Sequence, residues 1–139
     1  MATTIADLML GIEARLATVP GLRTSAIAPD QINPPTAIVG VPPIEAYRET
    51  MRRGTYVVEM TVTVLVSAAI DRVGQMLLAE YASPVGERSI PAAIEADRTL
   101  GGIAQECVVD SFRPLGLEEY GAIGYYGGTF GLRVAASGI

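Results

Sequence analysis

The sequence of 139 residues contains no histidine, no lysine and no tryptophan, and its one cysteine is Cys107. Histidine is the commonest general base and metal ligand, so its absence removes serine and cysteine triads of the usual kind. Without lysine there is no P-loop lysine and no Schiff-base nucleophile. A zinc site would need Cys107 and carboxylates alone. We therefore expect no enzyme activity, no catalytic residues, no metal and no cofactor.

Other absences concern the cell compartment. A single cysteine excludes an intrachain disulfide and fits a reducing environment. No apolar run approaches the roughly 18 to 20 residues of a membrane-spanning helix, and the N-terminus lacks the basic region and cleavage site of a signal peptide. The net charge of −5 argues against a dedicated nucleic-acid binder. We expect a soluble cytoplasmic product with no membrane association, folded as a single domain over residues 1–139.

Three segments have the pattern of helices. The first follows a capping Thr3 or Thr4 and runs to Val19, with apolar residues every three or four positions. The second is expected from about Ala69 to Ala82, and a short third helix follows a capping Ser89. The buried side of the second helix is predicted to carry Ile70, Val73, Leu77 and Tyr81.

The clearest strand is Thr55–Val66, in which every even position is apolar. This alternation predicts one face on the core and one facing water or a neighbour. The second face carries Thr61, Thr63 and Leu65. Further strands are expected at 36–41, 105–112 and about 125–136, with residues 113–124 as a loop or hairpin. The order of helix, strands, two helices and two strands predicts an α+β fold: a mainly antiparallel sheet with helices packed on one face.

Three features invite a chemical interpretation. The glycines near the C-terminus could cradle a phosphate, but they lack the GxGxxG spacing, so a hairpin or bulged strand with close backbone approach is favoured. The acid pair Glu118-Glu119 could serve a glycosidase only beside an aromatic cleft, and the chain has six tyrosines and two phenylalanines. A solvated loop tip or contact surface is favoured for this pair. Cys107 lies in a strand pattern and is interpreted as a packing residue.

One segment stands apart in charge. The stretch EAYRETMRRG, residues 45–54, holds three of the ten basic residues of an acidic chain, all of them arginines. It joins a strand that ends at two prolines to the long strand that begins at Thr55. We therefore expect a projecting loop or hairpin arm.

Three longer segments carry a resemblance to a known family. They are LRTSAIAPDQINPPTAIVGVPPIEAY, VTVLVSAAIDRVGQMLLAEYASP, and SIPAAIEADRTLGGIAQECVV with the later YYGGTFGLRV. Together they resemble the small neck proteins of long-tailed, siphovirus-type phages of actinobacteria, usually called tail terminators or head-to-tail connector components. The similarity covers nearly the whole chain, and AAIEADRTLGG is its most diagnostic piece. None of it is a catalytic motif.

The resemblance implies a structural role in the virion. Members of this family form a homo-oligomeric ring, typically a hexamer, which caps the tail tube protein and meets a head-side connector or stopper protein. Genomic DNA then passes through the ring without specific binding, and assembly takes place in the host cytoplasm. Two alternatives stay open: another neck component, such as a stopper or head-completion protein, and a small-ligand binding module.

The arginine segment supplies a hypothesis about contacts. Arginine pairs with carboxylates through two parallel hydrogen bonds, so Arg48, Arg52 and Arg53 are predicted to reach an acidic patch on another subunit or on the tail tube. Glu118 and Glu119 are the candidate partners across the ring. The competing interpretation is a solvated connection whose arginines only maintain solubility.

Overall fold

The computed structural model describes residues 3–25, 35–43, 51–52, 54–67, 72–120 and 123–137. The side chains of residues 25, 51–52, 115–120 and 123–124 lie outside that description. In chain order the elements are α1 (Ile5–Leu16), β1 (Arg23–Ser25), β2 (Thr36–Val39), β3 (Met51–Arg52), β4 (Thr55–Ser67), α3 (Arg72–Ala82), α4 (Ile90–Glu95), β5 (Glu106–Tyr120) and β6 (Ile123–Ser137).

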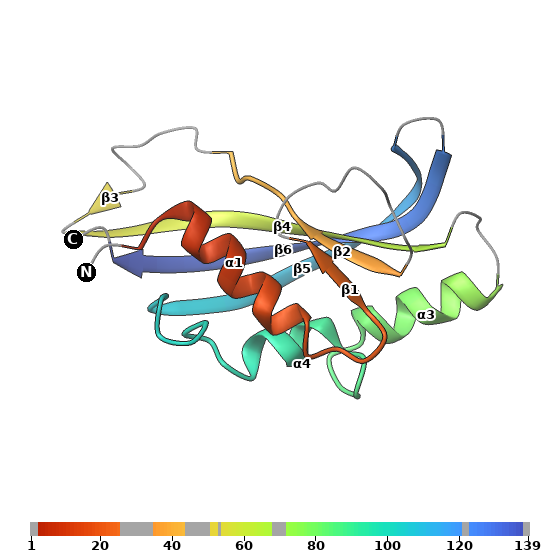
Figure 1. Cartoon of the computed structure of the whole chain (residues 1–139), viewed down its shortest axis with the longest axis horizontal. Coiled ribbons are helices and arrows are strands. Elements are labelled where there is room, and N and C mark those ends of the chain that lie inside the picture. The colour runs from red at the N-terminus through yellow and green to blue at the C-terminus, as the bar shows by residue number, and fades with distance from the viewer. Residues whose placement is uncertain are drawn as a thin grey trace.

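The described strands form one mixed sheet in the order β1-β2-β4-β6-β5, and β3 pairs with the beginning of β4. Only β1 and β2 run parallel; the remaining pairs are antiparallel. The helices lie on the same side of the sheet, with α1 over β1 and β2 and with α3 and α4 beneath β4, β6 and β5 (Figure 1). The predicted α+β fold class is confirmed.

Helix α1 follows its sequence pattern closely. Thr4 is the N-cap: its hydroxyl accepts from the backbone N–H of Asp7 at 3.1 Å, and its own N–H donates to the Asp7 carboxylate at 3.0 Å. This reciprocal capping box satisfies two backbone donors that the first turn leaves free. One face of the helix is buried, through Leu8, Met9, Ile12 and Leu16.

Strand β4 alternates as predicted over most of its length. Its even positions from Tyr56 to Val66 are buried against the helices, while Glu59 and Thr61 are exposed on the other face. Leu65 lies on that second face, as expected, but it is not exposed there. Leu65 is fully buried in a small separate cluster with Ile38 and Tyr125, from the two strands that flank β4.

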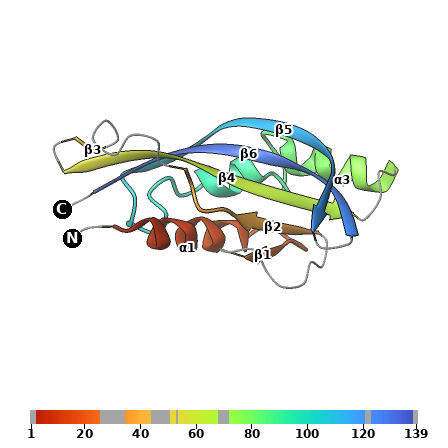
Figure 2. The same cartoon turned by 90° about the horizontal axis from the view of Figure 1, so that it is seen from above.

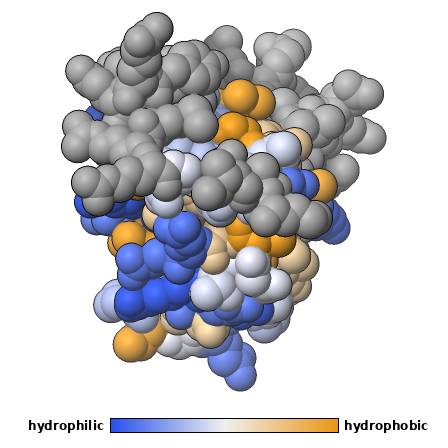
Figure 3. All heavy atoms as spheres, turned by 90° about the vertical axis from the view of Figure 1, so that its left-hand side faces the viewer, coloured by the Kyte–Doolittle hydropathy of each residue, from blue (hydrophilic) through white to orange (hydrophobic). Residues whose placement is uncertain are grey.

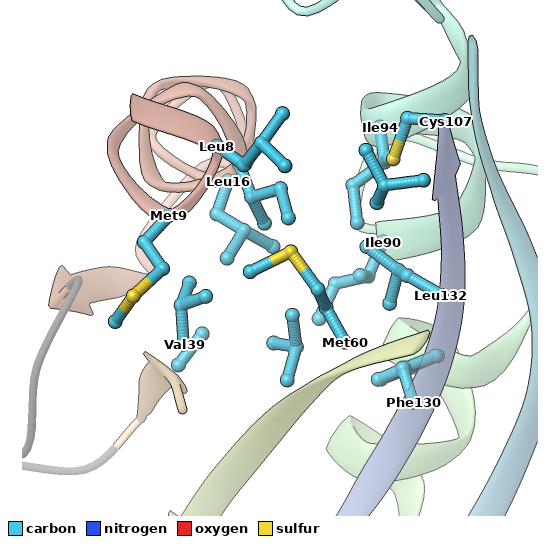
Figure 4. Packing of buried hydrophobic residues seen from close by; sticks show 14 of the residues in the cluster. Leu8, Met9, Leu16, Val39, Met60, Ile90, Ile94, Cys107, Phe130 and Leu132 are labelled. Carbon is cyan, nitrogen blue, oxygen red and sulfur yellow. The ribbon is translucent and has the colours of Figure 1, made fainter. Parts of the chain in front are cut away.

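The main core fills the space between the sheet and the helices (Figure 4). Met60 of β4 points toward Leu8 and Leu16 of α1, with Ile90 of α4 on its other side. Met60 and Leu8 have no exposed surface. Complete burial of one such side chain stabilises the fold by about 1.5–3 kcal/mol. The core therefore depends on contacts between elements far apart in the sequence.

The second half of the chain begins with the two remaining helices. Ser89 caps α4, as predicted, by accepting from the backbone N–H of Ala92 at 3.1 Å. The guanidinium of Arg15 on α1 donates to the carbonyl of Ala93 at 3.1 Å and joins the two helices. Helix α3 has its buried side at Gly74, Leu78 and Tyr81. The predicted Val73 is instead 76% exposed, and Ile70 lies outside the described residues.

Strands β5 and β6 form one long hairpin around residues 121–122. The segment 113–120, expected as a loop or hairpin, continues β5 through two bulges, at 109–111 and 114–117. The β4–β6 ladder ends at Tyr126, so the last residues of the hairpin extend beyond β4. Figure 2 shows the two strands side by side, passing over α3 and α4.

Candidate functional site

The described part of the arginine segment lies at one end of the sheet. Arg52 lies in β3 and pairs with Thr55, and Gly54 closes the turn with a φ of 78°, in the left-handed region that favours glycine. Arg48 and Arg53 lie outside the described residues. This end also holds the described end of β6, because Thr55 pairs with Ser137. Seen from here, the described surface is mostly hydrophilic with small hydrophobic patches (Figure 3).

The acid pair lies at the opposite end. Glu118 pairs with Tyr125 and Glu119 pairs with Gly124, next to the turn of the β5–β6 hairpin. Their placement in a loop was wrong, because both belong to β5. The hairpin alternative for this region was the correct one. The β4–β6 ladder ends at Tyr126, so the two acids, which pair with Tyr125 and Gly124, lie just beyond it.

The two predicted contact segments therefore cannot meet within one chain. Between Gly124 and Ser137, β6 advances 137 − 124 = 13 residues, which at about 3.4 Å each is roughly 44 Å. An arginine and a glutamate side chain together reach far less than this. Any pairing between Arg52 and Glu118 or Glu119 must join two molecules, with the β3 end of one against the hairpin end of the other.

The sheet face between these two ends carries no described helix. Many of its side chains in β4, β6 and β5 are small, hydroxylated or charged, and Val57 and Val108 lie among them. Glu59 lies directly opposite Arg133, and Thr61 lies opposite Gly131, whose added Cβ would stand 2.6 Å from the Ser111 hydroxyl. The middle of this face is therefore polar, and the apolar cluster of Ile38, Leu65 and Tyr125 lies farther along it.

The glycines of β6 serve packing. A Cβ on Gly127 would lie 1.8 Å from the carbonyl oxygen of Val64, and one on Gly128 would lie 2.5 Å from the ring of Phe112. Both distances are far inside van der Waals contact, so β6 can lie against its neighbours only with glycine there. The prediction of close backbone approach is confirmed for these two positions.

Cys107 is fully buried beside Ile94 (Figure 4). Burial raises the pKa of its thiol to about 12, and the nearby Glu95 carboxylate adds to the shift. At neutral pH the side chain is a thiol, not a nucleophilic thiolate. Its predicted packing role is confirmed.

Metal and membrane features are also absent from what is described. No group of three or more Cys, Asp or Glu side chains in the described ranges is arranged to hold a metal ion. Across those same ranges, no helix has both the length and the apolar composition that crossing a bilayer requires.

A feature that the sequence interpretation missed lies on α3. Its solvent side exposes Val73 and Met76, and an open hollow of about 390 Å³ runs beside them, between Arg72 and Arg88. A second hollow of about 420 Å³ adjoins it under the loop that carries Val85. Glu80 and Arg88, joined at 2.8 Å, line both hollows. The signal was present in the sequence, since a helix with apolar residues on every side has no single buried face.

No protein-family model matches the chain, and no curated protein sequence matches it.

Proposed function

We propose that the protein is a structural neck protein of a long-tailed phage, a tail terminator that forms a ring on the tail tube and joins it to the head-side connector. The observation that carries the proposal is the position of the two predicted contact segments. The arginine-bearing β3 and the acid pair of β5 lie at opposite ends of one sheet. Complementary ends on a single chain favour head-to-tail contacts, which close into rings.

The polar sheet face supports the same role. A ring subunit needs one face for its own core and other surfaces for neighbours, and the described helices all cover the same side. The opposite side, with Glu59, Thr61 and Arg133, offers small and polar groups to a partner such as the tube. The two hollows beside α3 are open, whereas a small-ligand module holds its ligand in a deep apolar pocket.

The stopper alternative fits less well. Stoppers are more often small closed β-barrels, whereas this sheet is open, with β1 and β5 as the ends of its strand order. The amphipathic α1 packed over one half of the sheet also favours the terminator.

End-to-end contact sets an expected size. The 15 residues of β6 span about 50 Å at about 3.4 Å each. In a regular hexagon the distance from centre to corner equals the side. Six subunits joined end to end would therefore form a ring roughly 100 Å across. Six copies of a chain with net charge −5 carry a formal charge of −30, which suits a channel that DNA crosses without binding.

Charge reversal tests the proposal. Changing Arg52 and Arg53 to glutamate should abolish assembly while the monomer stays folded, as measured by native mass spectrometry and circular dichroism. Reversing Glu118 and Glu119 to arginine in the same chain should restore assembly in part, through the coupling that a double-mutant cycle measures. Unchanged assembly after the arginine reversal would reduce the segment to a solvated connection. If assembly is lost and the glutamate reversal does not restore it, the partner of the arginines would be the tail tube.

A further inference from the structure

The solvent side of α3 has an ordered arrangement of side chains. At 100° per residue, Met76 lies opposite the buried Gly74, Leu78 and Tyr81, so it is at the centre of the exposed face. Met76 is 62% exposed. Arg72 precedes it by one turn, and Glu80 follows it by one turn. The exposed face thus reads as a positive charge, an apolar centre and a negative charge along the helix axis.

This face is self-complementary under a two-fold rotation. If two copies of α3 lie antiparallel with the axis at Met76, Arg72 of each helix faces Glu80 of the other. Val73 and Ala79 stand three residues before and after Met76, and both are exposed and apolar. Under the same rotation Val73 and Ala79 lie on opposite edges of the contact, where they flank the charged pairs. The charges are matched, as an isologous contact requires.

We propose that α3 forms a two-fold contact with α3 of a second copy of this chain. Among the described residues, Arg72 makes no ion pair. Glu80 is already held by Arg88 at 2.8 Å through one carboxylate oxygen. Its other oxygen accepts Arg72 of the partner subunit. The hollow beside Met76 gives room for the thioether side chain of the second copy, which adapts readily to irregular space.

The size of the contact limits its strength. The 11 residues of α3 make a helix about 16 Å long and about 10 Å wide. This footprint is well below the roughly 800 Å² per partner of a standard stable interface. The pair is therefore weak between free subunits. It becomes strong when many copies engage at once, as when two rings stack face to face.

The contact is independent of the ring proposed above. It uses the side of α3, whereas the ring contacts use β3 and the tip of the β5–β6 hairpin. A two-fold contact through α3 joins two free subunits or two rings and leaves the sheet ends available. Loss of either contact can be measured without the other.

Disulfide trapping tests the inference. A Met76→Cys variant places two thiols next to the two-fold axis, where helices 8–10 Å apart bring Cβ atoms within disulfide range. The native Cys107 is buried and protonated, so it contributes no background. With oxidised glutathione, Met76→Cys should form a covalent dimer within minutes. Leu10→Cys, at an equally exposed position on α1 (58%), is the matched control and should stay monomeric.

Charge variants in the Met76→Cys background identify the geometry. Adding Arg72→Glu replaces two attractive pairs with two repulsive ones and should slow dimer formation roughly tenfold. Adding Arg72→Glu together with Glu80→Arg recreates both pairs in reverse and should restore most of the rate. Arg88→Ala, which removes only the internal ion pair, should change it by less than about twofold.

Three results would overturn the inference. The first is a Met76→Cys protein that remains monomeric under oxidant at the highest soluble concentration. The second is equal trapping of Leu10→Cys, which would reveal random collision. The third is trapping at Met76 that does not respond to either charge variant, which would assign the surface to a partner of different chemistry.

Discussion

Helices α1 and α3 have similar lengths, but the spacing of apolar residues predicts the buried face correctly in α1 and incorrectly in α3. In α1 the buried apolar residues Leu8, Met9, Ile12 and Leu16 lie on one side, and Leu10 is exposed on the other. In α3 apolar residues surround the helix, and two of them, Val73 and Met76, face solvent. Periodicity identifies a buried face only when the opposite face is polar. Where it is not, packing selects the face.

On α3, Gly74 is buried in place of the predicted Val73. The buried side consists of Gly74, Leu78 and Tyr81. A hydrophobicity pattern ranks Val73 above Gly74, so it rotates the helix in the wrong direction. The apolar residues left outside are then free for contacts with another molecule.

The largest expected effect comes from truncating a side chain on the buried side of α3, compared with one on its exposed side. Leu78 is 3% exposed, and Leu78→Ala should lower the free energy of unfolding by about 2–5 kcal/mol, because it leaves a cavity. Val73→Ala should stay within about 0.5 kcal/mol of the parent. Urea denaturation at low protein concentration measures both. Equal losses of unfolding free energy in the two variants would show that Val73 is buried.

A medium effect is expected at the start of α1. Thr4→Ala removes the oxygen that caps the Asp7 N–H and should cost about 1 kcal/mol. Thr4→Ser keeps that oxygen and should differ from the parent by only a few tenths of a kcal/mol. Thermal unfolding followed by circular dichroism gives both values. If serine and alanine behave alike, the capping box does not stabilise α1.

The smallest effect concerns pH. Hydrogen bonds from Thr4 hold the pKa of Asp7 below its usual value of 3.8. Because the folded pKa is depressed, the contribution is present above the unfolded pKa and is lost as pH falls through the folded one. Asp7→Asn should therefore flatten the acid limb of the stability curve below about pH 4. Asp97, whose pKa is lowered mainly by a hydrogen bond from Thr99, remains in that variant as an internal control.

Much of the fold could be predicted because several local signals agree. The caps Thr4 and Ser89, the alternation of β4 and the turn before Thr55 all point to the observed elements. The extension of β5 to Tyr120 could not be predicted, since Pro114 and Gly116 are poor strand residues. Its bulges absorb these residues, and the long partner β6 supplies the pairing.

The candidate contact residues were found by charge alone. Clustering singled out Arg52 and its neighbours, and the adjacent acids marked Glu118 and Glu119. That they lie at opposite ends of the sheet depends on β3 pairing with β4 and on the register of the β5–β6 hairpin. Such long-range pairing is not encoded in any local window. The α3 face was missed because its charges, Arg72 and Glu80, become meaningful only once its buried side is known.

Covalent trapping of the sheet ends tests the head-to-tail ring most directly. A chain with Arg52→Cys and Glu119→Cys should, under mild oxidation, give a ladder of linked subunits that ends at six, read by denaturing electrophoresis and native mass spectrometry. Each single variant should give dimers at most. A double variant that stops at dimers, or that remains unlinked while the protein assembles, would contradict the account.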